Sequence, residues 1–350
     1  MAQREAGRAA RDRKAKRYLG QPEKAIEVGP KSVSELLDAM SQTGFQGRRL
    51  GEAARIWSEM VRQKGLTILM GYAGSMSTTG QWKIVRWLIE NRFIDVLVST
   101  GANISEDIFE AMGHNYYQGT WMDNDEDLLE AKIDRFYDVY ADEYDYRELE
   151  GLIKNFAATL DPKRPYSTRE FLNRFGEYQW KKGIRSITAA AWRHKVPVYS
   201  PGLIDSGYGV ALSLLKREGK LIVLDQTQDM EELGKIAERT KKTGVVYIGG
   251  GVPKDTIQLA TIIKSLAGGG EEETPHDYAI QITTDSPQWG GLSGCTLEEA
   301  ISWGKIAARS QRSVVYCDAT LALPLITHAM NEKVTARTDP PDLGWVFKTK

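Results

Sequence analysis

The feature that most constrains the fold is a series of short apolar runs spread along the chain. These runs are rich in β-branched and aromatic residues and are mostly apolar throughout, instead of alternating between apolar and polar residues. That pattern is typical of strands buried on both faces, as in a parallel sheet. The predicted strands cover residues 67–70, 94–98, 196–199, 221–224, 245–248, 278–282 and 313–317.

Helix-like segments lie between several of these runs. Residues 81–90 place Trp82, Val85 and Ile89 on one side, and residues 256–266 form a second such segment. Apolar residues at spacings of three and four between positions 33 and 61 predict a helical extension before the first strand. The alternation predicts an α/β fold with a doubly wound, mostly parallel sheet and helices on both faces. In such sheets, ligands bind where loops leave the carboxyl ends of strands.

Composition and charge restrict the class of protein. The chain has 350 residues, 41% hydrophobic and 27% charged, which suits a large folded core. With a net charge of -1, it lacks a bulk electrostatic attraction for nucleic acid or anionic lipid. No apolar run approaches the roughly 18 residues of a membrane span. We therefore expect a cytoplasmic protein that binds neither nucleic acid nor membrane.

The first twenty residues are basic, but no apolar stretch follows them as in a signal peptide. We expect a solvated extension over residues 1–32, with an amphipathic helix or a partner-binding arm as alternatives. A domain over residues 33–335 and a tail over residues 336–350 follow. Cys295 and Cys317 are too few for a disulfide framework or a zinc site. No metal site is expected.

Four loops after predicted strands are rich in glycine and small polar residues. They cover residues 71–80, 99–107, 200–209 and 249–255. Glycines let backbone amides approach a phosphate, and a following helix start adds its partial positive charge. Each loop alone reads best as an ordinary turn, and neither GxGxxG nor GxxxxGK[ST] occurs. Four together favour a dinucleotide site of unusual connectivity.

The segment SGCTLEEAISWGKIAARS contains a capping box, because Thr296 is followed three residues later by Glu299. We expect a helix from Leu297 to about Arg309, with Lys305 beside its apolar stripe. The stripe consists of Leu297, Ile301, Gly304 and Ala308.

A lysine held in an apolar pocket loses hydration, which favours the neutral amine that attacks an imine or carbonyl. Trp303 would wall such a pocket. The alternative for any lone lysine is a surface side chain that extends into solvent.

Five segments of the chain together resemble the deoxyhypusine synthase family, over about residues 33–330. They are DVLVSTGANISED, SPGLIDSG, GGGVPKD, AISWGKI and YCDATLALPL. The resemblance implies a Rossmann-like catalytic domain that binds NAD. It also implies a homotetramer with NAD and active sites at subunit interfaces.

The activity implied by the resemblance is an NAD-dependent transfer of an alkylamine group. In the family, NAD accepts hydride from spermidine, and the aminobutyl group passes to a lysine and then to an acceptor amine. That acceptor is a lysine of translation initiation factor 5A in deoxyhypusine synthase, whereas relatives use putrescine and make homospermidine. The implied partners are a small amine and a protein acceptor.

The family's functional positions fall on particular residues of this sequence. The covalent lysine falls on Lys305, the pocket tryptophan on Trp303 and an acid on Glu299, which could instead only cap its helix. Asp255 falls on the proton-transfer position. The implied cofactor contacts are Ser75, Thr78, Thr100, Glu106, Asp205, Gly250, Gly251, Thr284, Asp285 and Asp318. For Asp205 and Asp318, capping a helix is the alternative role.

Three positions depart from the spermidine-using members. Asp255 stands where those members have a histidine, and Val210 and Leu292 stand where they have carboxylates that hold ammonium groups. An ammonium without a partner is strongly disfavoured in an apolar site, so spermidine in its usual pose is not expected. Asp255 would act as a general base, as a new counter-ion, or as the N-cap of a helix starting near Thr256.

Four rival functions stay open. Two are enzymes: deoxyhypusine synthase itself, and homospermidine synthase. The third is a catalytically silent NAD-binding scaffold, against which the retained SWGK segment argues. The fourth is nucleic-acid binding through the basic N-terminal residues.

Overall fold

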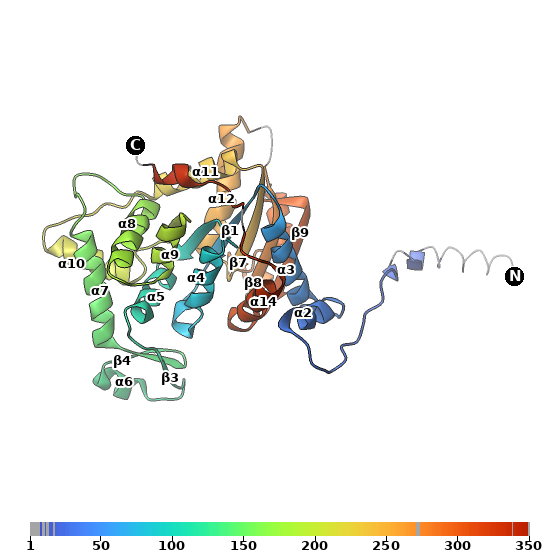
Figure 1. The fold of residues 1–350 in the computed structure, drawn as a ribbon, viewed down its shortest axis with the longest axis horizontal. Helices are drawn as coiled ribbons and strands as arrows, with labels where there is room; N and C mark the ends of the chain where they lie inside the picture. The colour runs from blue at the N-terminus through green and yellow to red at the C-terminus, as the bar shows by residue number, and fades with distance from the viewer. Residues whose placement is uncertain are drawn as a thin grey trace.

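The computed structural model describes residues 8, 11, 14–16, 18–270, 274–337 and 339–348. The predicted basic extension, residues 1–32, therefore lies partly outside the described residues. From residue 19 to the first helix of the folded body, the chain forms no helix or strand and runs away from the body (Figure 1). Glu23 in this stretch forms an ion pair of 2.8 Å with Arg48.

A six-stranded parallel sheet forms the centre of the molecule. Its strand order is β6-β2-β1-β7-β8-β9. In that order the bounds are Val198–Gly202, Val96–Thr100, Leu66–Tyr72, Lys242–Ile248, His276–Thr283 and Ile306–Tyr316. The order reverses between β1 and β7, so the sheet is doubly wound and its switch point lies between these two strands. The predicted fold class is confirmed.

The strands are buried because both faces of the sheet are covered. On β1, Ile68 and Met70 face one apolar cluster, whereas Leu69 between them faces the other. This alternation within an apolar run is the period of a strand with two buried faces. The continuous apolar runs of the sequence are thereby explained.

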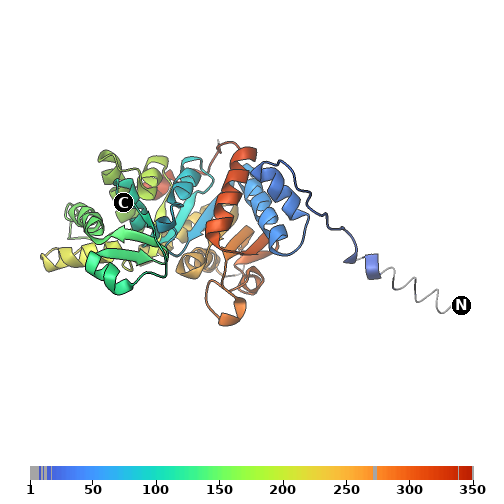
Figure 2. The same ribbon diagram turned by 90° about the horizontal axis from the view of Figure 1, so that it is seen from below.

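Helices cover the sheet on both sides (Figures 1 and 2). The larger apolar cluster includes residues of α2, α3, α4, α5, α7, α8, α9, α10 and α14, and the smaller one includes residues of α11, α12 and α13. The bounds on the first side are α2 (Val33–Ser41), α3 (Phe45–Arg62), α4 (Trp82–Glu90), α5 (Asn103–Ala111), α7 (Glu143–Ala157), α8 (Thr168–Lys181), α9 (Ile187–His194), α10 (Gly207–Arg217) and α14 (Ala319–Lys333). On the other side they are α11 (Gln226–Arg239), α12 (Gly251–Ala267) and α13 (Leu297–Ser302).

A small second sheet projects from the body beside α6 (Asp125–Ala131) (Figure 1). It has the strand order β3-β5-β4, with β3 (Tyr117–Gln118), β4 (Ile133–Phe136) and β5 (Val139–Asp142). All its pairs are antiparallel. Three short 3-10 helices complete the described elements: η1 (Ser77–Thr79), η2 (Pro287–Trp289) and η3 (Gly344–Phe347).

One predicted strand is wrong. Residues 221–224 form no strand, and only Leu224 makes an isolated bridge, to Tyr166. Leu221 and Val223 are about half exposed, so the run is not buried on both faces. The run lies between α10 and α11 in the chain, and the Tyr166 amide donates to its Val223 carbonyl at 2.9 Å.

The predicted helix from Leu297 to Arg309 is also wrong beyond its second turn. Helix α13 ends at Ser302, and Gly304 has a φ of 67°. Glycine adopts this left-handed conformation without steric cost and commonly terminates helices. The chain then enters β9 at Ile306, so the expected apolar stripe stops before Ala308, which is exposed.

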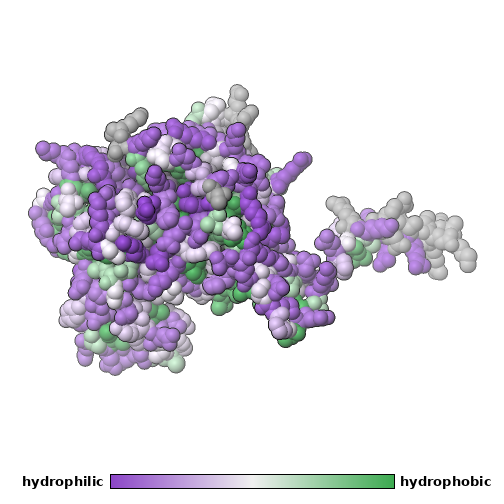
Figure 3. Space-filling model, in the orientation of Figure 1, coloured by the Kyte–Doolittle hydropathy of each residue, from purple (hydrophilic) through white to green (hydrophobic). Residues whose placement is uncertain are grey.

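The segment after α14 packs onto the domain. The Arg337 side chain is 1% exposed and pairs with the fully buried Asp95 at 2.8 Å. Leu343 and Val346 are buried in the smaller apolar cluster. Among the described helices, none has both the length and the apolarity to traverse a bilayer. The face in Figure 3 is mostly hydrophilic with scattered apolar patches.

Candidate active site

The carboxyl edge of the main sheet collects every predicted cofactor residue. Each of them lies at or just after the end of one of the six strands: Ser75 and Thr78 after β1, Thr100 and Glu106 after β2, Asp205 after β6, Gly250 and Gly251 after β7, Thr284 and Asp285 after β8, and Asp318 after β9. In doubly wound sheets this edge, near the switch point, is where ligands bind.

The loops after β1 and β2 are joined by side-chain hydrogen bonds. The Ser75 hydroxyl donates to Glu106 Oε2 at 2.8 Å and lies 3.5 Å from the Thr78 hydroxyl. The Thr100 hydroxyl donates to the carbonyl of Gly74 at 2.8 Å. Hydroxyls of these loops therefore meet a carboxylate on α5, as a sugar-hydroxyl site requires.

Glu106 and its neighbour Asp107 are buried carboxyl groups. Burial raises the pKa of Glu106 to about 7, although the hydrogen bond from Ser75 opposes the rise. Burial likewise raises the pKa of Asp107 to about 7, and the backbone hydrogen bond from Ile187 opposes it. Two neighbouring carboxyl groups with raised pKa values, both on α5, are typical of a site arranged for function. Ionisation of either group would lower the stability of the fold.

We expect Glu106→Gln to stabilise the protein at alkaline pH. An ordinary Glu pKa of 4.5 in the unfolded chain and about 7 in the folded state mean that the folded protein retains the proton between these values. Stability therefore falls as pH rises through this window, by on the order of 3 kcal/mol for the full shift. In Glu106→Gln, the part of the fall in stability that Glu106 causes should disappear. The part that Asp107 causes should remain. Urea unfolding from pH 4.5 to 8.5 measures it.

The matched control is Glu238→Gln on α11, where the carboxylate is exposed. Its stability curve should follow the parent curve at every pH. A Glu106→Gln curve that also follows the parent would show that Glu106 titrates as an ordinary carboxyl group.

The turn after β7 is in close contact with the loop after β8. The Gly251 amide donates to Ser293 Oγ at 3.0 Å, and a Cβ built on Gly250 would lie 2.5 Å from Ser293 Cα. Gly251 also has a φ of 52°. A side chain at Gly250 would force the two segments apart, whereas one at Gly251 would be strained by the left-handed backbone. Thr284 and Asp285 lie at the start of this same loop, and Thr284 is exposed.

Asp205 and Asp318 differ in how they are held. Asp318 is the N-cap of α14, because its Oδ1 accepts hydrogen bonds from the Thr320 amide and hydroxyl, both at 2.7 Å. The capping alternative for Asp318 is therefore realised. Asp205 does not cap α10, whose N-cap is Ser206. Its carboxylate is exposed at the end of β6.

Lys305 occupies a defined position in a helix-ending motif. The Lys305 amide donates to the Ala300 carbonyl and the Gly304 amide to the Ile301 carbonyl, both at 3.0 Å. This pair of bonds is the Schellman arrangement around a left-handed glycine. The Lys305 carbonyl accepts from the His276 amide at the start of β8. The backbone of the lysine is therefore fixed on both sides.

The Lys305 side chain is shielded and paired. It is 12% exposed, and its Nζ lies 3.0 Å from Asp255 Oδ1. Asp255 lies inside α12, which begins at Gly251, so the predicted N-cap of a helix starting near Thr256 is wrong. The Asp255 carboxylate therefore does not cap a helix and is available to pair with Lys305. This geometry excludes the alternative in which Lys305 is a surface side chain that extends into solvent.

Trp303 lies beside the lysine, whereas Glu299 lies beside Cys295. Lys305 Nζ is 5.5 Å from the centre of the Trp303 ring, yet the ring is 62% exposed in the single chain, so it does not seal the pocket alone. The Glu299 amide donates to Thr296 Oγ1 at 2.9 Å, which confirms the helix start. The exposed Glu299 carboxylate lies beside Cys295 and adds to the rise that burial causes in the thiol pKa.

Lys254 is a buried residue that the sequence reasoning missed. It precedes Asp255, is 1% exposed, and donates to Gln281 Oε1 at 3.0 Å and to the Cys295 carbonyl. Burial lowers its pKa. The available signal was its position three residues before Ile257, which puts it on the inward face of α12.

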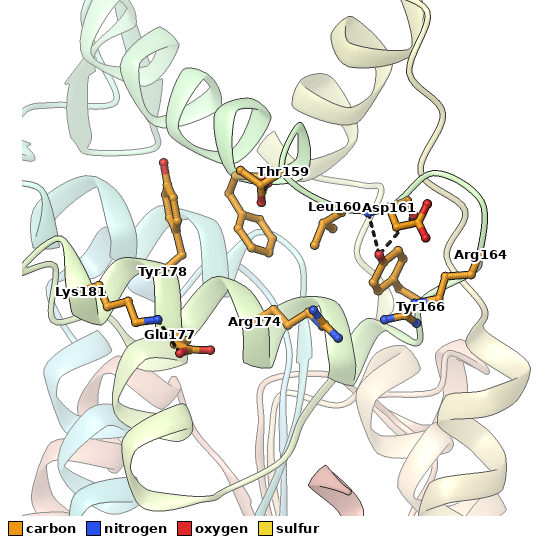
Figure 4. Close-up of a pocket in the computed structure, with 10 residues that line it drawn as sticks. Thr159, Leu160, Asp161, Arg164, Tyr166, Arg174, Glu177, Tyr178 and Lys181 are labelled. Atoms are coloured by element: carbon orange, nitrogen blue, oxygen red, sulfur yellow. Dashed lines mark hydrogen bonds and ion pairs between the residues drawn. The ribbon is translucent and has the colours of Figure 1, made fainter. Parts of the chain in front are cut away.

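Two cavities lie away from the loops that carry the predicted site residues. One of about 470 Å³ lies between the end of α7 and α8, lined by residues that include Tyr166, Arg174 and Tyr178 (Figure 4). Its arginines, Arg164 and Arg174, both pair with Glu170. Another of about 810 Å³ lies beside Trp345. No predicted site residue lines either cavity, so the candidate site stays with the carboxyl-edge loops and Lys305.

Comparison with known proteins follows the same segments. The family model "Deoxyhypusine synthase" matches residues 35–330. The chain is 45% identical to "Probable deoxyhypusine synthase 2" of Methanosarcina mazei, over 94% of this chain and 95% of that protein. It is 36% identical to a "Deoxyhypusine synthase-like protein" of Elusimicrobium minutum, over 89% and 84%.

A solved structure shares the fold. It is a crystal structure from Entamoeba histolytica, provisionally assigned as a deoxyhypusine synthase, with a TM-score of 0.62 and 18% identity. The match covers 90% of this chain and 99% of that one. With the family model and the curated relatives, the conclusion is that the chain belongs to the deoxyhypusine synthase family, a family of transferases.

Proposed function

We propose that the protein is an NAD-dependent transferase that moves an alkylamine group from a donor amine, through a covalent imine on Lys305, to an acceptor amine. The observation that carries the proposal is the shielded Lys305 ammonium, 12% exposed and 3.0 Å from Asp255. An amine held away from water beside a carboxylate can lose its proton to that carboxylate and attack an electrophilic carbon.

The residues at the carboxyl edge fit a dinucleotide. Ser75, Thr100 and Glu106 would meet sugar hydroxyls, and the turn at Gly250 and Gly251 at the start of the 17-residue α12 would meet the pyrophosphate. When bound, NAD supplies the hydride acceptor for the oxidation of the donor amine and returns the hydride after transfer. Asp205, Thr284, Asp285 and Asp318 would complete the contacts, Asp318 with the oxygen that its capping bonds leave free.

Lys305 and Asp255 would carry the transfer itself. The carboxylate takes a proton from the ammonium, and the amine adds to the oxidised carbon of the donor. The donor's departing amine takes the proton, which leaves the group bound to Lys305 as an imine. An acceptor amine then displaces the lysine. Trp303 and Glu299 would bound the space in which these amines exchange.

The donor is proposed to differ from spermidine in its usual pose. Val210 and Leu292 stand where carboxylates would hold ammonium groups, and both are more than 40% exposed in the single chain. Trp303 is exposed beside Lys305 as well. Apolar side chains in place of those carboxylates favour a donor with fewer positive charges. Their exposure also supports a homotetramer with sites at subunit interfaces, which we propose to act in the cytoplasm.

A screen of amines with NAD tests the proposal, with NADH absorbance as the readout. Donor oxidation precedes transfer, so the screen needs no knowledge of the acceptor. We expect NADH from at least one small amine. Turnover of spermidine with initiation factor 5A would support deoxyhypusine synthase proper instead, and putrescine as acceptor would support homospermidine synthesis. If the protein binds NAD but no amine in the panel reduces it, the transferase proposal fails. The protein would then be a catalytically silent NAD-binding scaffold.

We expect Asp255→Asn to lower the transfer rate by about 10²–10⁴-fold, the range for a lost general base. The amide keeps the shape of the side chain but cannot take a proton from Lys305. Asp38→Asn is the matched control, because Asp38 pairs with Lys333 in an exposed lysine–aspartate pair. Steady-state transfer rates should separate the two variants. Equal rates for Asp255→Asn and the parent would exclude Asp255 from proton transfer.

A further inference from the structure

Lys254 is a buried cation held by neutral partners. Its ammonium donates to Gln281 Oε1 at 3.0 Å and to the backbone carbonyl of Cys295. Within the described residues it has no ion pair, although the residue is 1% exposed. The nearest acids, Glu299 and Asp255, act on its charge from beyond ion-pair distance. Burying a charge without a directly paired counter-ion is costly, so its hydrogen bonds to neutral groups call for a compensating role.

Gln281 completes a network with Lys254. Its Nε2 donates to the carbonyl of Gly249 at 2.9 Å and to the carbonyl of Ser293 at 2.8 Å. The two side chains thus satisfy three backbone carbonyls, one in the turn after β7 and two in the loop before α13. Both residues are buried, so water does not compete for these bonds.

The segments that this network joins carry both halves of the candidate site. The turn after β7 contains Gly250 and Gly251 and leads to Asp255. The loop after β8 begins with Thr284 and Asp285 and leads through α13 to Lys305. The ammonium of Lys254 holds the carbonyl of Cys295, one residue before the N-cap of α13. The placement of α13 sets the placement of Lys305, because the motif at Gly304 fixes the lysine to the helix end.

We propose that Lys254 and Gln281 are positioning residues that hold the loop of residues 284–296 against the turn of residues 249–251, and so keep Lys305 beside Asp255. This deepens the proposed function and, for the effect on the reaction, rests on it. Lys254 forms no hydrogen bond with Asp255 or Lys305 in the described network, although its charge acts on both from a distance. The positioning that we propose runs through its hydrogen bonds to the loop.

Hydrogen exchange measured by mass spectrometry tests the structural part without any substrate. In Lys254→Met, amides in residues 284–304 should exchange about tenfold to a hundredfold faster, as expected when hydrogen bonds from a charged donor are lost. Amides in α3 and α14 should be unchanged. Lys264→Met is the matched control, since this lysine lies on the same helix and is only partly buried. It should leave residues 284–304 unchanged.

The ratio of borohydride-trapped adduct on Lys305 to NADH formed tests the effect on the reaction. A variant that is only less stable forms less adduct and less NADH in the same proportion. Its ratio of adduct to NADH therefore stays constant. Lys254→Met and Gln281→Met should each lower the ratio about tenfold. The double variant should lower it no further than either single change, because both remove the same constraint.

Three results would overturn the inference. Unchanged exchange in residues 284–304 would show that the network does not hold the loop. A uniform rise across α3, α14 and the loop would show general destabilisation. Local exchange with an unchanged adduct ratio would remove the link to Lys305. If the parent protein forms neither NADH nor adduct, the proposed function fails, and the exchange experiment still decides whether the network holds the loop.

Discussion

Lys305→Ala is expected to lower the rate of group transfer by on the order of a thousandfold or more, because the substitution removes the covalent nucleophile. Oxidation of the donor should remain measurable as NADH, because it precedes attack by the lysine. Lys305→Arg should lower the transfer rate as well, since the guanidinium of arginine stays protonated and cannot attack carbon. Transfer of an isotope-labelled donor carbon to the acceptor measures the first effect, and absorbance measures the second.

Lys333→Ala provides the control, because Lys333 pairs with Asp38 at the surface in the same way that Lys305 pairs with Asp255. It should leave both transfer and oxidation unchanged. Transfer that persists in Lys305→Ala at the parent rate would show direct passage between amines, with no covalent lysine.

Asp95→Asn is expected to lower the free energy of unfolding by about 3–5 kcal/mol, the cost of breaking a buried ion pair from one side. The substitution leaves the Arg337 guanidinium, which is 1% exposed, without its carboxylate. Asp95 also accepts from the Ile68 amide at 2.8 Å and from Arg92 at 3.1 Å, so it joins β1, β2 and the segment after α14. Urea unfolding of the variant measures the loss.

Asp38→Asn is again the control, because an exposed ion pair contributes about 1 kcal/mol or less. A loss in Asp95→Asn no larger than that of the control would show that Arg337 does not depend on the carboxylate. The variant Asp95→Leu with Arg337→Met should recover part of the loss, since it removes both members of the fully buried pair and leaves only the less buried Arg92 without its carboxylate.

The main sheet could be predicted because its information is local. The runs at 67–70 and 245–248 are mostly apolar, and such a run is typical of a strand covered on both faces. The run at 221–224 is just as apolar, but Leu221 and Val223 are about half exposed, and no local signal distinguishes this run from the others. Its fate depends on Tyr166, which lies more than fifty residues earlier in the chain.

The end of the helix before Lys305 was predictable in principle. Gly304 carries the usual signal of a helix terminus, but the apolar spacing from Leu297 through Ala308 outweighed it in the sequence reasoning. The pairing of Lys305 with Asp255 was not predictable from spacing, since fifty residues separate them and the bend at Gly304 directs the side chain. The resemblance supplied both residues, and the structure supplies their contact.

Long-range polar contacts were hardest to foresee. Lys254 and Gln281 are polar residues in otherwise apolar segments, and sequence alone does not show which carbonyls they meet. Arg337 lies in a segment taken for a tail, although it binds at the amino edge of the sheet. Buried polar groups obtain their partners from tertiary structure, so their roles emerge only when the strands and loops are in place.

The most direct test of the account is the mass of the Lys305 peptide after incubation with NAD and a donor that yields NADH, followed by borohydride reduction. We predict that this peptide gains the mass of the reduced alkylamine group, and that the peptide containing Lys333 gains none. An unmodified Lys305 peptide in a reaction that has transferred its group to the acceptor would contradict the account.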